Sequence, residues 1–180
     1  MRLRLGGRAR RLGDDINSDY IIASTRKRDT LDEAVLKQYL LETIDPGFAA
    51  SVRPGDLLVA GRNFGCGSAM EIAATVILAA GIRAVLARSF SRTFYRNAVN
   101  NGLVPVECDT TAIQEGDVLE VEMTDATIGV INLATQQTLA GTPLPGVMLA
   151  ILEAGGLVPY MRTNGGFRAH GEGERGKREG

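Results

Sequence analysis

The residues that could do chemistry gather in the stretch NFGCGSAMEIA, residues 63–73. Glycines at 65 and 67 would let backbone lie against a ligand, and Ser68 stands where a helix is expected to begin. Unpaired amides at a helix start attract carboxylate or phosphate. The same letters also have a purely structural interpretation, because Ser68 and Glu71 have the spacing of a capping box and the glycines suit a turn. Spacing alone leaves both interpretations open.

Nucleotide binding is not favoured by this stretch. A Walker A loop requires Gly-Lys-Ser/Thr, and residues 63–73 contain no lysine. A Rossmann fingerprint requires a small residue where Met70 stands, and no acidic residue follows at the distance that motif requires. The stretch therefore gives only weak support to nucleotide binding.

Cysteine and histidine are scarce, which limits the available chemistry. The two cysteines are Cys66 and Cys108, and the single histidine is His170 in a glycine-rich tail. Two thiols cannot complete a four-cysteine iron–sulfur site, and a histidine base or His-rich zinc site inside the folded body is not expected. We expect that a serine, an arginine or a carboxylate acts, or that another chain brings the harder chemistry.

Composition indicates an ordinary globular domain. The chain has 180 residues, 44% of them hydrophobic and 23% charged, with a formal net charge of −1. A near-neutral chain has no global field that would attract nucleic acid. No apolar stretch is long enough to span a membrane, and the basic N-terminus lacks the apolar core of a secretory signal. These features predict a cytoplasmic protein.

Hydrophobic patterning predicts the elements that must position the glycine loop, residues 63–68. Strands are expected at 57–60, 83–87 and 103–108, with helices between them at 69–80 and 91–102. This order implies a parallel βαβ unit. The short alternating segments of 116–141 predict an antiparallel meander, followed by a last helix within 143–156.

The N-terminal part is less regular. Residues 3–12 predict a first strand, 20–23 a short β-rich run, and 31–44 a helix ended by Asp45-Pro46-Gly47. The charged segment 24–33 separates the last two as a loop. Residues 164–180 are rich in glycine and mixed charge, so we expect a disordered tail.

Three stretches carry a family resemblance. They are GDDINSDYIIA, GRNFGCGSAMEIA and GIRAVLARSFSRTFYRNAVNNGLVPVE, in family order over residues 13–107. The set resembles the small subunit of the isopropylmalate isomerase and homoaconitase group, which is the swivel domain of the aconitase superfamily. The resemblance implies an α/β fold over residues 1–163, an aconitase-type swivelling β/β/α domain whose mixed sheet has a parallel core and flanking helices.

The resemblance also implies a division of labour between two chains. The small subunit closes an active site whose [4Fe-4S] cluster is held by a separate large subunit, in a heterodimer or heterotetramer. The reaction class is dehydration and rehydration of a small hydroxy-di- or tricarboxylic acid. Ser68 aligns with the family serine that, as alkoxide, takes the proton from carbon, and Cys66 lies in the motif without being a cluster ligand.

The chain departs from the family pattern at the residues that bind substrate. The family text N-F-G-C-G-S-S-R-E-H-A has a serine and an arginine after Ser68, where this chain has Ala69 and Met70. That arginine helps to bind a substrate carboxylate through a bidentate fork, which methionine cannot offer. Gly67, Ala69 and Met70 are the positions of this loop that we expect to bind substrate. Either the substrate lacks a carboxylate near Met70, or another basic residue substitutes for the arginine, or the chain has lost the usual activity.

The charged segment offers a replacement for the missing arginine. Arg28 falls on the arginine of the family's substrate-selecting loop, whereas Arg26 and Lys27 replace aromatic and apolar residues of that loop. We hypothesise that Arg26 or Lys27 offsets the absence of arginine at position 70. The alternative is that these cations are solvated loop charges.

Four further residues are expected to support the site. By resemblance, Asp19 orders the substrate loop through hydrogen bonds, and Arg92 faces the active site or the partner interface. Glu71 would complete the capping box, and Cys66 belongs to the loop motif. Each also has a plain alternative, namely a turn aspartate, an exposed helix arginine or a structural cap.

The expected function is the small subunit of 3-isopropylmalate dehydratase, in leucine biosynthesis. Homoaconitase and a methylated-malate dehydratase, such as one for citramalate, remain alternatives within the same class. An alternative from another class is a non-catalytic anion-binding module that kept the fold. No nucleic acid, no membrane and no metal held by this chain are expected.

Overall fold

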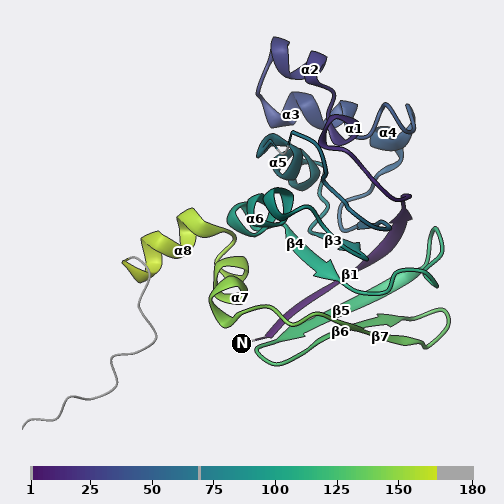
Figure 1. The fold of residues 1–180 in the computed structure, drawn as a ribbon, viewed down its shortest axis with the longest axis vertical. Helices are drawn as coiled ribbons and strands as arrows, with labels where there is room; N and C mark the ends of the chain where they lie inside the picture. The colour runs from purple at the N-terminus through teal and green to yellow at the C-terminus, as the bar shows by residue number, and fades with distance from the viewer. Residues whose placement is uncertain (1, 69, 166–180) are drawn as a thin grey trace, which may run out of the picture.

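The fold is organised around one seven-stranded mixed sheet (Figure 1). The computed structural model describes residues 2–68 and 70–165. The strands lie in the order β4-β3-β2-β1-β5-β6-β7. Their bounds are β1 Arg2–Arg11, β2 Leu57–Val59, β3 Ala84–Ala87, β4 Val104–Glu107, β5 Val118–Thr124, β6 Ile128–Asn132 and β7 Thr138–Gly141.

Strand β1 is shared by the two halves of the sheet. Its last residues, Ala9–Arg11, pair in parallel with β2, and β2, β3 and β4 continue the parallel half. Its earlier residues, Arg2–Arg8, pair antiparallel with β5, and β6 and β7 complete the meander. The predicted parallel βαβ unit and the predicted meander are both confirmed, and so is the mixed sheet with a parallel core.

Side chains of the parallel strands alternate between two apolar cores. Leu58 and Val85 face one core, and their neighbours Leu57 and Leu86 face the other. Burial on both faces is what a parallel strand requires, and it explains why these strands are short uninterrupted apolar runs in the sequence.

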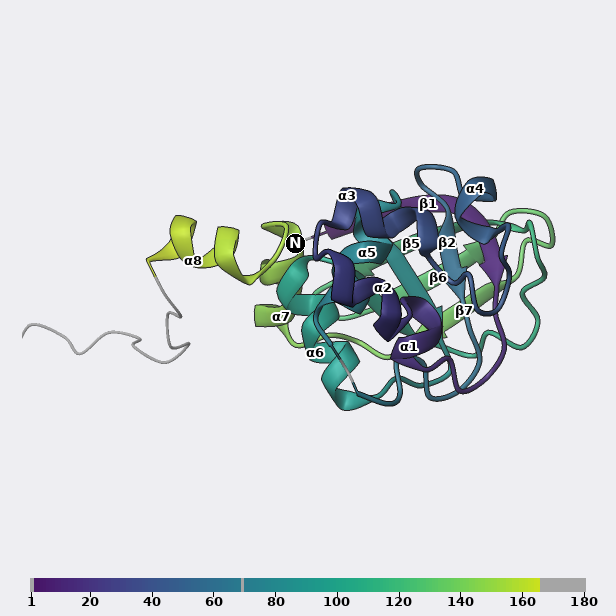
Figure 2. The same ribbon diagram turned by 90° about the horizontal axis from the view of Figure 1, so that it is seen from above.

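Helices cover the parallel half. Their bounds are α1 Ser18–Ile21, α2 Ser24–Asp29, α3 Glu33–Leu36, the 3₁₀ turn η1 Lys37–Tyr39, α4 Phe48–Ser51, α5 Ile72–Ala79, α6 Arg92–Asn101, α7 Gly146–Glu153 and α8 Leu157–Asn164. Figures 1 and 2 show α1–α5 gathered on one side of the parallel strands. Helix α7 belongs to the core on the other face, where its Leu149 and Leu152 are buried with Leu86 and Val104 of the parallel strands. No described helix is long and apolar enough to cross a membrane.

The N-terminal expectations need correction. The β-rich run at 20–23 is wrong, because the Asn17 side chain accepts the backbone N–H of Asp19 and caps α1, which buries Ile21. The single helix over 31–44 is broken into α3, η1 and a turn at Leu41, whose φ is +57°. Leu36, Leu40 and Leu41 are all fully buried, and the turned chain carries all three into the core.

Three further differences concern elements near the site or the C-terminus. The segment 24–33, expected as a loop, contains α2. Helix α5 begins at Ile72 rather than at 69. Helix α8 was not expected, and the tail prediction for 164–180 falls from residue 166 onward outside the described residues, so it stays a prediction.

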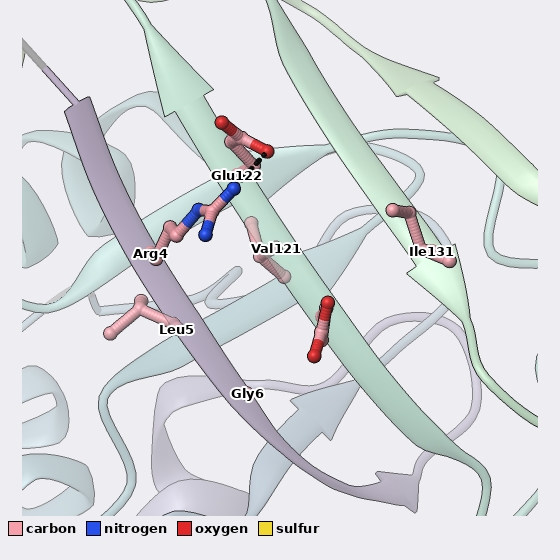
Figure 3. Close-up of a pocket in the computed structure, with 7 residues that line it drawn as sticks. Arg4, Leu5, Gly6, Val121, Glu122 and Ile131 are labelled. Atoms are coloured by element: carbon pink, nitrogen blue, oxygen red, sulfur yellow. Dashed lines mark hydrogen bonds and ion pairs between the residues drawn. The ribbon is translucent and has the colours of Figure 1, made fainter.

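The antiparallel half leaves its outer face open. Arg4 and Glu122 lie opposite each other on β1 and β5, and a nitrogen of the guanidinium is 3.3 Å from the carboxylate. They border a shallow hollow of about 190 Å³ whose lining also includes Gly6 and Ile131 (Figure 3). The opposite face of the same strands is apolar and belongs to the second core.

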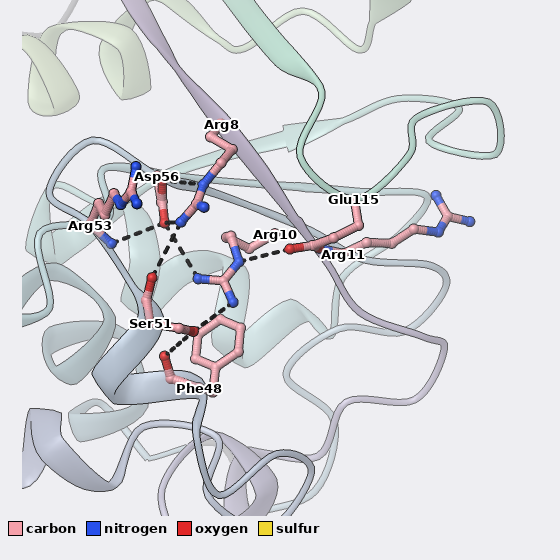
Figure 4. Close-up of polar contacts among 8 residues, drawn as sticks. All are labelled: Arg8, Arg10, Arg11, Phe48, Ser51, Arg53, Asp56 and Glu115. Atoms are coloured by element: carbon pink, nitrogen blue, oxygen red, sulfur yellow. Dashed lines mark hydrogen bonds and ion pairs between the residues drawn. The ribbon is translucent and has the colours of Figure 1, made fainter.

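A buried ion network fastens β1 to the turn that precedes β2 (Figure 4). Arg8 donates two hydrogen bonds to the Asp56 carboxylate, at 3.2 and 2.8 Å. The Arg10 side chain, only 9% exposed, donates to Asp56, to Ser51 Oγ and to Glu115. Its guanidinium also lies 4.6 Å from the centre of the Phe48 ring. The network holds two loops against the strand that joins the halves of the sheet.

The charge of Asp56 is stabilised in the fold. Burial raises the pKa of Asp56, but hydrogen bonds from Arg8 and from the backbone N–H of Arg53 outweigh it and hold that pKa below its usual value. A carboxyl whose pKa is lowered by folding adds stability above its unfolded pKa and loses it as the pH falls through the folded value.

We predict that Asp56→Asn lowers the free energy of unfolding by about 3 kcal/mol at pH 7, because Arg8 loses its carboxylate partner and buried Arg10 keeps only Glu115. The wild type should lose stability below about pH 4. The variant should lose less over that range, because its amide does not titrate. Urea unfolding at pH 7 and pH 3.5 measures both effects, and equal stability of the two proteins at pH 7 would contradict the proposed role of the network.

Candidate functional site

The candidate site lies at the edge of the sheet where the parallel strands end. The segments that follow β1, β2 and β3 run side by side there, through bridges between Asn17 and Cys66 and between Phe64 and Phe90. The Gly65 N–H donates to Ile16 O at 2.8 Å, which ties the first two segments together. In open α/β sheets, ligands bind outside this carboxyl edge.

Two glycines make this approach of backbones sterically allowed. Gly65 has φ +77°, and a Cβ there would lie 2.2 Å from Cγ of buried Phe94. Gly67 has φ +89°, and a Cβ there would lie 2.6 Å from the side-chain amide of Asn17. Both positions combine a left-handed backbone with no room for a side chain, so only glycine fits. The glycine loop is therefore a device for close packing, as well as a surface that a ligand can approach.

Ser68 is exposed at the tip of this loop. The predicted capping box is wrong. Helix α5 begins at Ile72 with Glu71 in the cap position and no side-chain cap. The Glu71 carboxylate accepts a hydrogen bond from Asn101 Nδ2 at 3.1 Å instead. Among the described residues the Ser68 hydroxyl has no hydrogen-bond partner. The interpretation of Ser68 as a helix cap is therefore not supported.

Lys27 reaches the loop from α2. Its ammonium lies 3.3 Å from Asp19 Oδ1 and 3.3 Å from the thioether sulfur of Met70. The Lys27 side chain is only 6% exposed, whereas Met70 is 41% exposed. A thioether is a weak acceptor, so Met70 covers the ammonium without neutralising it. The ammonium thus lies beside the position where the family pattern has arginine, with the Asp19 carboxylate as its ion-pair partner.

Asp19 holds that lysine in place. Its Oδ1 also accepts a hydrogen bond from the Ser24 hydroxyl at 2.5 Å. The Ser24 hydrogen bond, together with the contact with Lys27, lowers the pKa of Asp19 despite some desolvation. Asp19 therefore stays ionised and links α1 to α2, which agrees with the ordering role expected for it.

The two arginines of α2 differ in what they contact. Arg26 donates to both carboxylate oxygens of Glu42, at 2.8 and 3.1 Å, and its guanidinium lies 3.9 Å from the centre of the Tyr39 ring. These contacts direct Arg26 toward the residues after α3 and away from Met70. Arg28 is exposed and has no ion-pair partner among the described residues.

The remaining candidates surround this group. Cys66 is half-buried, and its carbonyl accepts the Ser18 N–H at 2.8 Å, so it contributes backbone to the loop. Arg92 is exposed at the start of α6, on the far side of the Phe64–Phe90 bridge. Ala69 lies outside the described residues. The structure thus brings Asp19, Lys27 and Met70 together and leaves Arg26 out.

Sequence reasoning missed two contributors. Asn17 caps α1 and packs against Gly67, and Ser24 bonds Asp19. An asparagine just before the buried Ser18-to-Ile22 segment has the pattern of an N-cap, which is a signal that was present. The Ser24 contact depends on how α1 and α2 pack, and no local pattern indicates it.

The donor set does not build a metal centre. Among the described residues, no group of three or more histidine, cysteine, aspartate or glutamate side chains could hold a metal ion. Burial raises the pKa of Cys108 to about 12, so this thiol is a poor metal ligand. An iron–sulfur cluster would not fit on these residues.

Comparison with known proteins shows the family to which the chain belongs. The family described as the aconitase C-terminal domain matches residues 21–111. The chain is 45% identical to 3-isopropylmalate dehydratase small subunit 1 of Methanopyrus kandleri, over 92% of this chain and 96% of that one. It is 43% identical to the isopropylmalate/citramalate isomerase small subunit of Methanocaldococcus jannaschii, over 90% and 96%.

A solved structure supports the same relationship. The crystal structure of 3-isopropylmalate dehydratase from Methanocaldococcus jannaschii superposes with a TM-score of 0.83 at 40% identity. The match covers 91% of this chain and 96% of that one. The family resemblance and the fold expected from it are both confirmed.

The glycine loop makes a sharp stability prediction. We expect Gly65→Ala to cost about 3 kcal/mol or more, because it adds a clash with Phe94 to the strain of a left-handed backbone. Gly116→Ala is the matched control, since Gly116 has φ +84° and no atom lies within 4 Å of the place that a Cβ would occupy. The control should cost only about 1–2 kcal/mol.

Denaturant unfolding of both variants checks this expectation. Equal losses in the two would mean that the segments can move apart at little cost, and that close packing does not hold the loop.

Proposed function

Because the chain belongs to the aconitase C-terminal domain family, we propose that it is the small subunit of a two-chain hydro-lyase that dehydrates and rehydrates 3-isopropylmalate. The main support is the combination of near-complete coverage of relatives named as small subunits with an exposed Ser68 at the loop tip. The large subunit would sit over the carboxyl edge, with the substrate between the two chains.

The large subunit would hold the [4Fe-4S] cluster. The donor set of this chain supports that division, because its described residues form no group that could ligate a metal. When bound in the partner, the cluster supplies Lewis-acid activation of the substrate hydroxyl and a carboxylate. This chain then has to supply a base for the C–H proton and a cation for the remaining carboxylate.

Ser68 is the proposed base. Its hydroxyl is exposed and is not used by any described neighbour, so it is free to meet a substrate carbon. A serine oxygen acts as a base only when its anion is stabilised. The Lys27 ammonium, which contacts Met70 two residues further on, adds positive charge near the loop.

Lys27 is the proposed replacement for the family arginine. Both cations have a carboxylate partner, Asp19 for Lys27 and Glu42 for Arg26. Only Lys27 contacts Met70, whereas Arg26 is stacked on Tyr39. The ammonium offers a point charge in place of the planar fork of arginine. The substrate carboxylate would therefore be attracted to Lys27 without having to adopt the fixed orientation that a bidentate arginine imposes. Rotation of the flexible Met70 side chain would open the ammonium to the substrate.

Citramalate is a second candidate substrate. The relative from Methanocaldococcus jannaschii is named for both isopropylmalate and citramalate. Replacement of a guanidinium fork by a point charge and an exposed thioether favours a site that tolerates more than one side group. Homoaconitate and a non-catalytic anion-binding role are the alternatives that reconstitution separates.

Reconstitution with the large subunit tests the proposal. The tagged chain is purified from its native cells, the copurifying large chain is identified by its cluster cysteines, and the pair is assayed on 3-isopropylmalate, citramalate and homocitrate. We expect turnover of isopropylmalate by the pair and none by this chain alone. Ser68→Ala should lower kcat by about 10²–10⁴-fold while assembly stays intact.

Two results would contradict the proposal. Near wild-type turnover by the Ser68→Ala pair would remove the serine from the chemistry. A stable wild-type pair that turns over none of the three acids would favour the anion-binding role.

Lys27→Met is a separate test of substrate binding. We expect the KM for isopropylmalate to rise at least about tenfold, which corresponds to about 1.4 kcal/mol. Met70→Arg in the Lys27→Met background should recover much of that loss, because it restores a cation at the same place. Arg26→Met is the matched control and should leave KM unchanged, although it removes the pairing with Glu42. An unchanged KM in Lys27→Met would refute the compensation.

A further inference from the structure

A second cationic feature lies on the same edge, beside the site rather than in it. A hollow of about 440 Å³ is lined by Phe90, Arg92, Tyr95, Arg96 and Glu107. Phe90 follows β3, Glu107 ends β4, and the two arginines belong to the first turns of α6. The hollow therefore opens at the carboxyl edge of the parallel strands.

Among the described residues, the two arginines of this hollow have no ion-pair partner, unlike Arg4, Arg8 and Arg10. Neither Arg92 nor Arg96 forms an ion pair or side-chain hydrogen bond with another described residue. By contrast, Arg4 beside the hollow of the antiparallel half is paired with Glu122 (Figure 3). The two guanidiniums of α6 are thus both exposed and available.

Their position is electrostatically unfavourable for the isolated chain. Cations near a helix N-terminus oppose the helix dipole, and like charges at i and i+4 repel each other. Arg92 is the first residue of α6, directly after its cap Ser91, and Arg96 follows at i+4. A local arrangement that costs stability without a compensating contact is typical of a functional surface.

The floor of the hollow is aromatic. The rings of Phe90 and Tyr95 pack edge to face with centroids 5.8 Å apart, and both side chains are half-buried. Arginine and tyrosine around an aromatic floor are the residue types enriched where protein partners bind most tightly. The hollow can hold a carboxylate between two guanidiniums with an apolar side chain beneath it.

Its place beside the glycine loop indicates the partner. Ser91 Oγ donates to Gly65 O at 2.7 Å, so the start of α6 is hydrogen-bonded to the loop that carries Ser68. Any chain that covers Ser68 has to pass close to this helix start. An open hollow of this kind suits a segment of a protein partner better than a small ligand, which binds in more enclosed pockets.

We propose that the hollow formed by Phe90, Arg92, Tyr95, Arg96 and Glu107 is a docking socket for an acidic segment of the large subunit, with a carboxylate between the arginines and an apolar side chain on the aromatic floor. This inference rests on the proposed two-chain function. It assigns to Arg92 and Arg96 a role in assembly that is separate from substrate binding.

The test compares two double variants. The first double variant, Arg92→Ala with Arg96→Ala, removes both positive charges from the socket. The control, Arg53→Ala with Arg83→Ala, removes two exposed arginines from the segments that precede β2 and β3, at the opposite edge of the sheet. Affinity for the purified large subunit is measured by surface-immobilised binding at low and at high salt. Circular dichroism checks that each variant is folded, and single Arg92→Gln and Arg96→Gln variants replace the double variant if it is not.

We expect the socket variant to bind the large subunit at least about tenfold more weakly than wild type, with a smaller salt dependence. The control should bind as wild type does. KM of the assembled socket variant, measured at saturating large subunit, should match wild type. Together these results would support a docking role.

Other outcomes overturn the inference. Unchanged affinity of the socket variant would exclude docking at this hollow, and a raised KM with unchanged affinity would assign the arginines to substrate. Binding is read without turnover, so a wild-type pair that associates but turns over no acid would refute the proposed substrate and leave the docking result standing. A wild-type chain that does not bind the large subunit would refute both.

Discussion

Close approach of three backbones at the carboxyl edge is the constraint on which the site depends. The segment after β2 lies between the segments after β1 and β3 and is bridged to both. There is no space for side chains at Gly65 and Gly67, where Phe94 and Asn17 already occupy the volume that a Cβ would need. The loop that carries Ser68 is therefore held by packing on each side, and its tip is left exposed.

The rest of the sheet keeps that edge in place. Strand β1 pairs with β2 on one side and β5 on the other, so a single strand fixes the parallel half relative to the meander. The network around Arg10 and Asp56 acts at the amino end of β2, and it anchors the strand from which the loop emerges. A rigid scaffold with functional groups on its loops is the usual way in which α/β proteins position chemistry.

Much of the fold could be predicted from the sequence because the central strands are buried on both faces. Short apolar runs bounded by Gly55, Gly81 and Gly102 indicate the βαβ unit, and alternation indicates the meander. The region before β2 could not be predicted in this way. Its short helices are fixed by an asparagine cap and by tertiary burial of Ile21, Leu40 and Leu41, and these contacts override local β propensity and helical spacing.

The resemblance proposes the residues of the candidate site, and only the structure gives their contacts. Resemblance points to Ser68, Asp19 and the cations of 26–28, and spacing suggested a capping box that the structure does not form. Which cation replaces the arginine was undecidable from sequence, since Arg26 and Lys27 are neighbours. The choice follows from the helical geometry of α2, which directs Lys27 to Met70 and Arg26 to Glu42.

A structure of the assembled pair with bound substrate tests the central claim most directly, through the distance from Ser68 Oγ to the carbon that loses its proton. The proposed mechanism predicts about 3–3.5 Å, the separation of reacting groups held for transfer. It also predicts a substrate carboxylate within hydrogen-bond distance of Lys27 Nζ. A Ser68 side chain turned away from the substrate, with a base from the large subunit in its place, would contradict it.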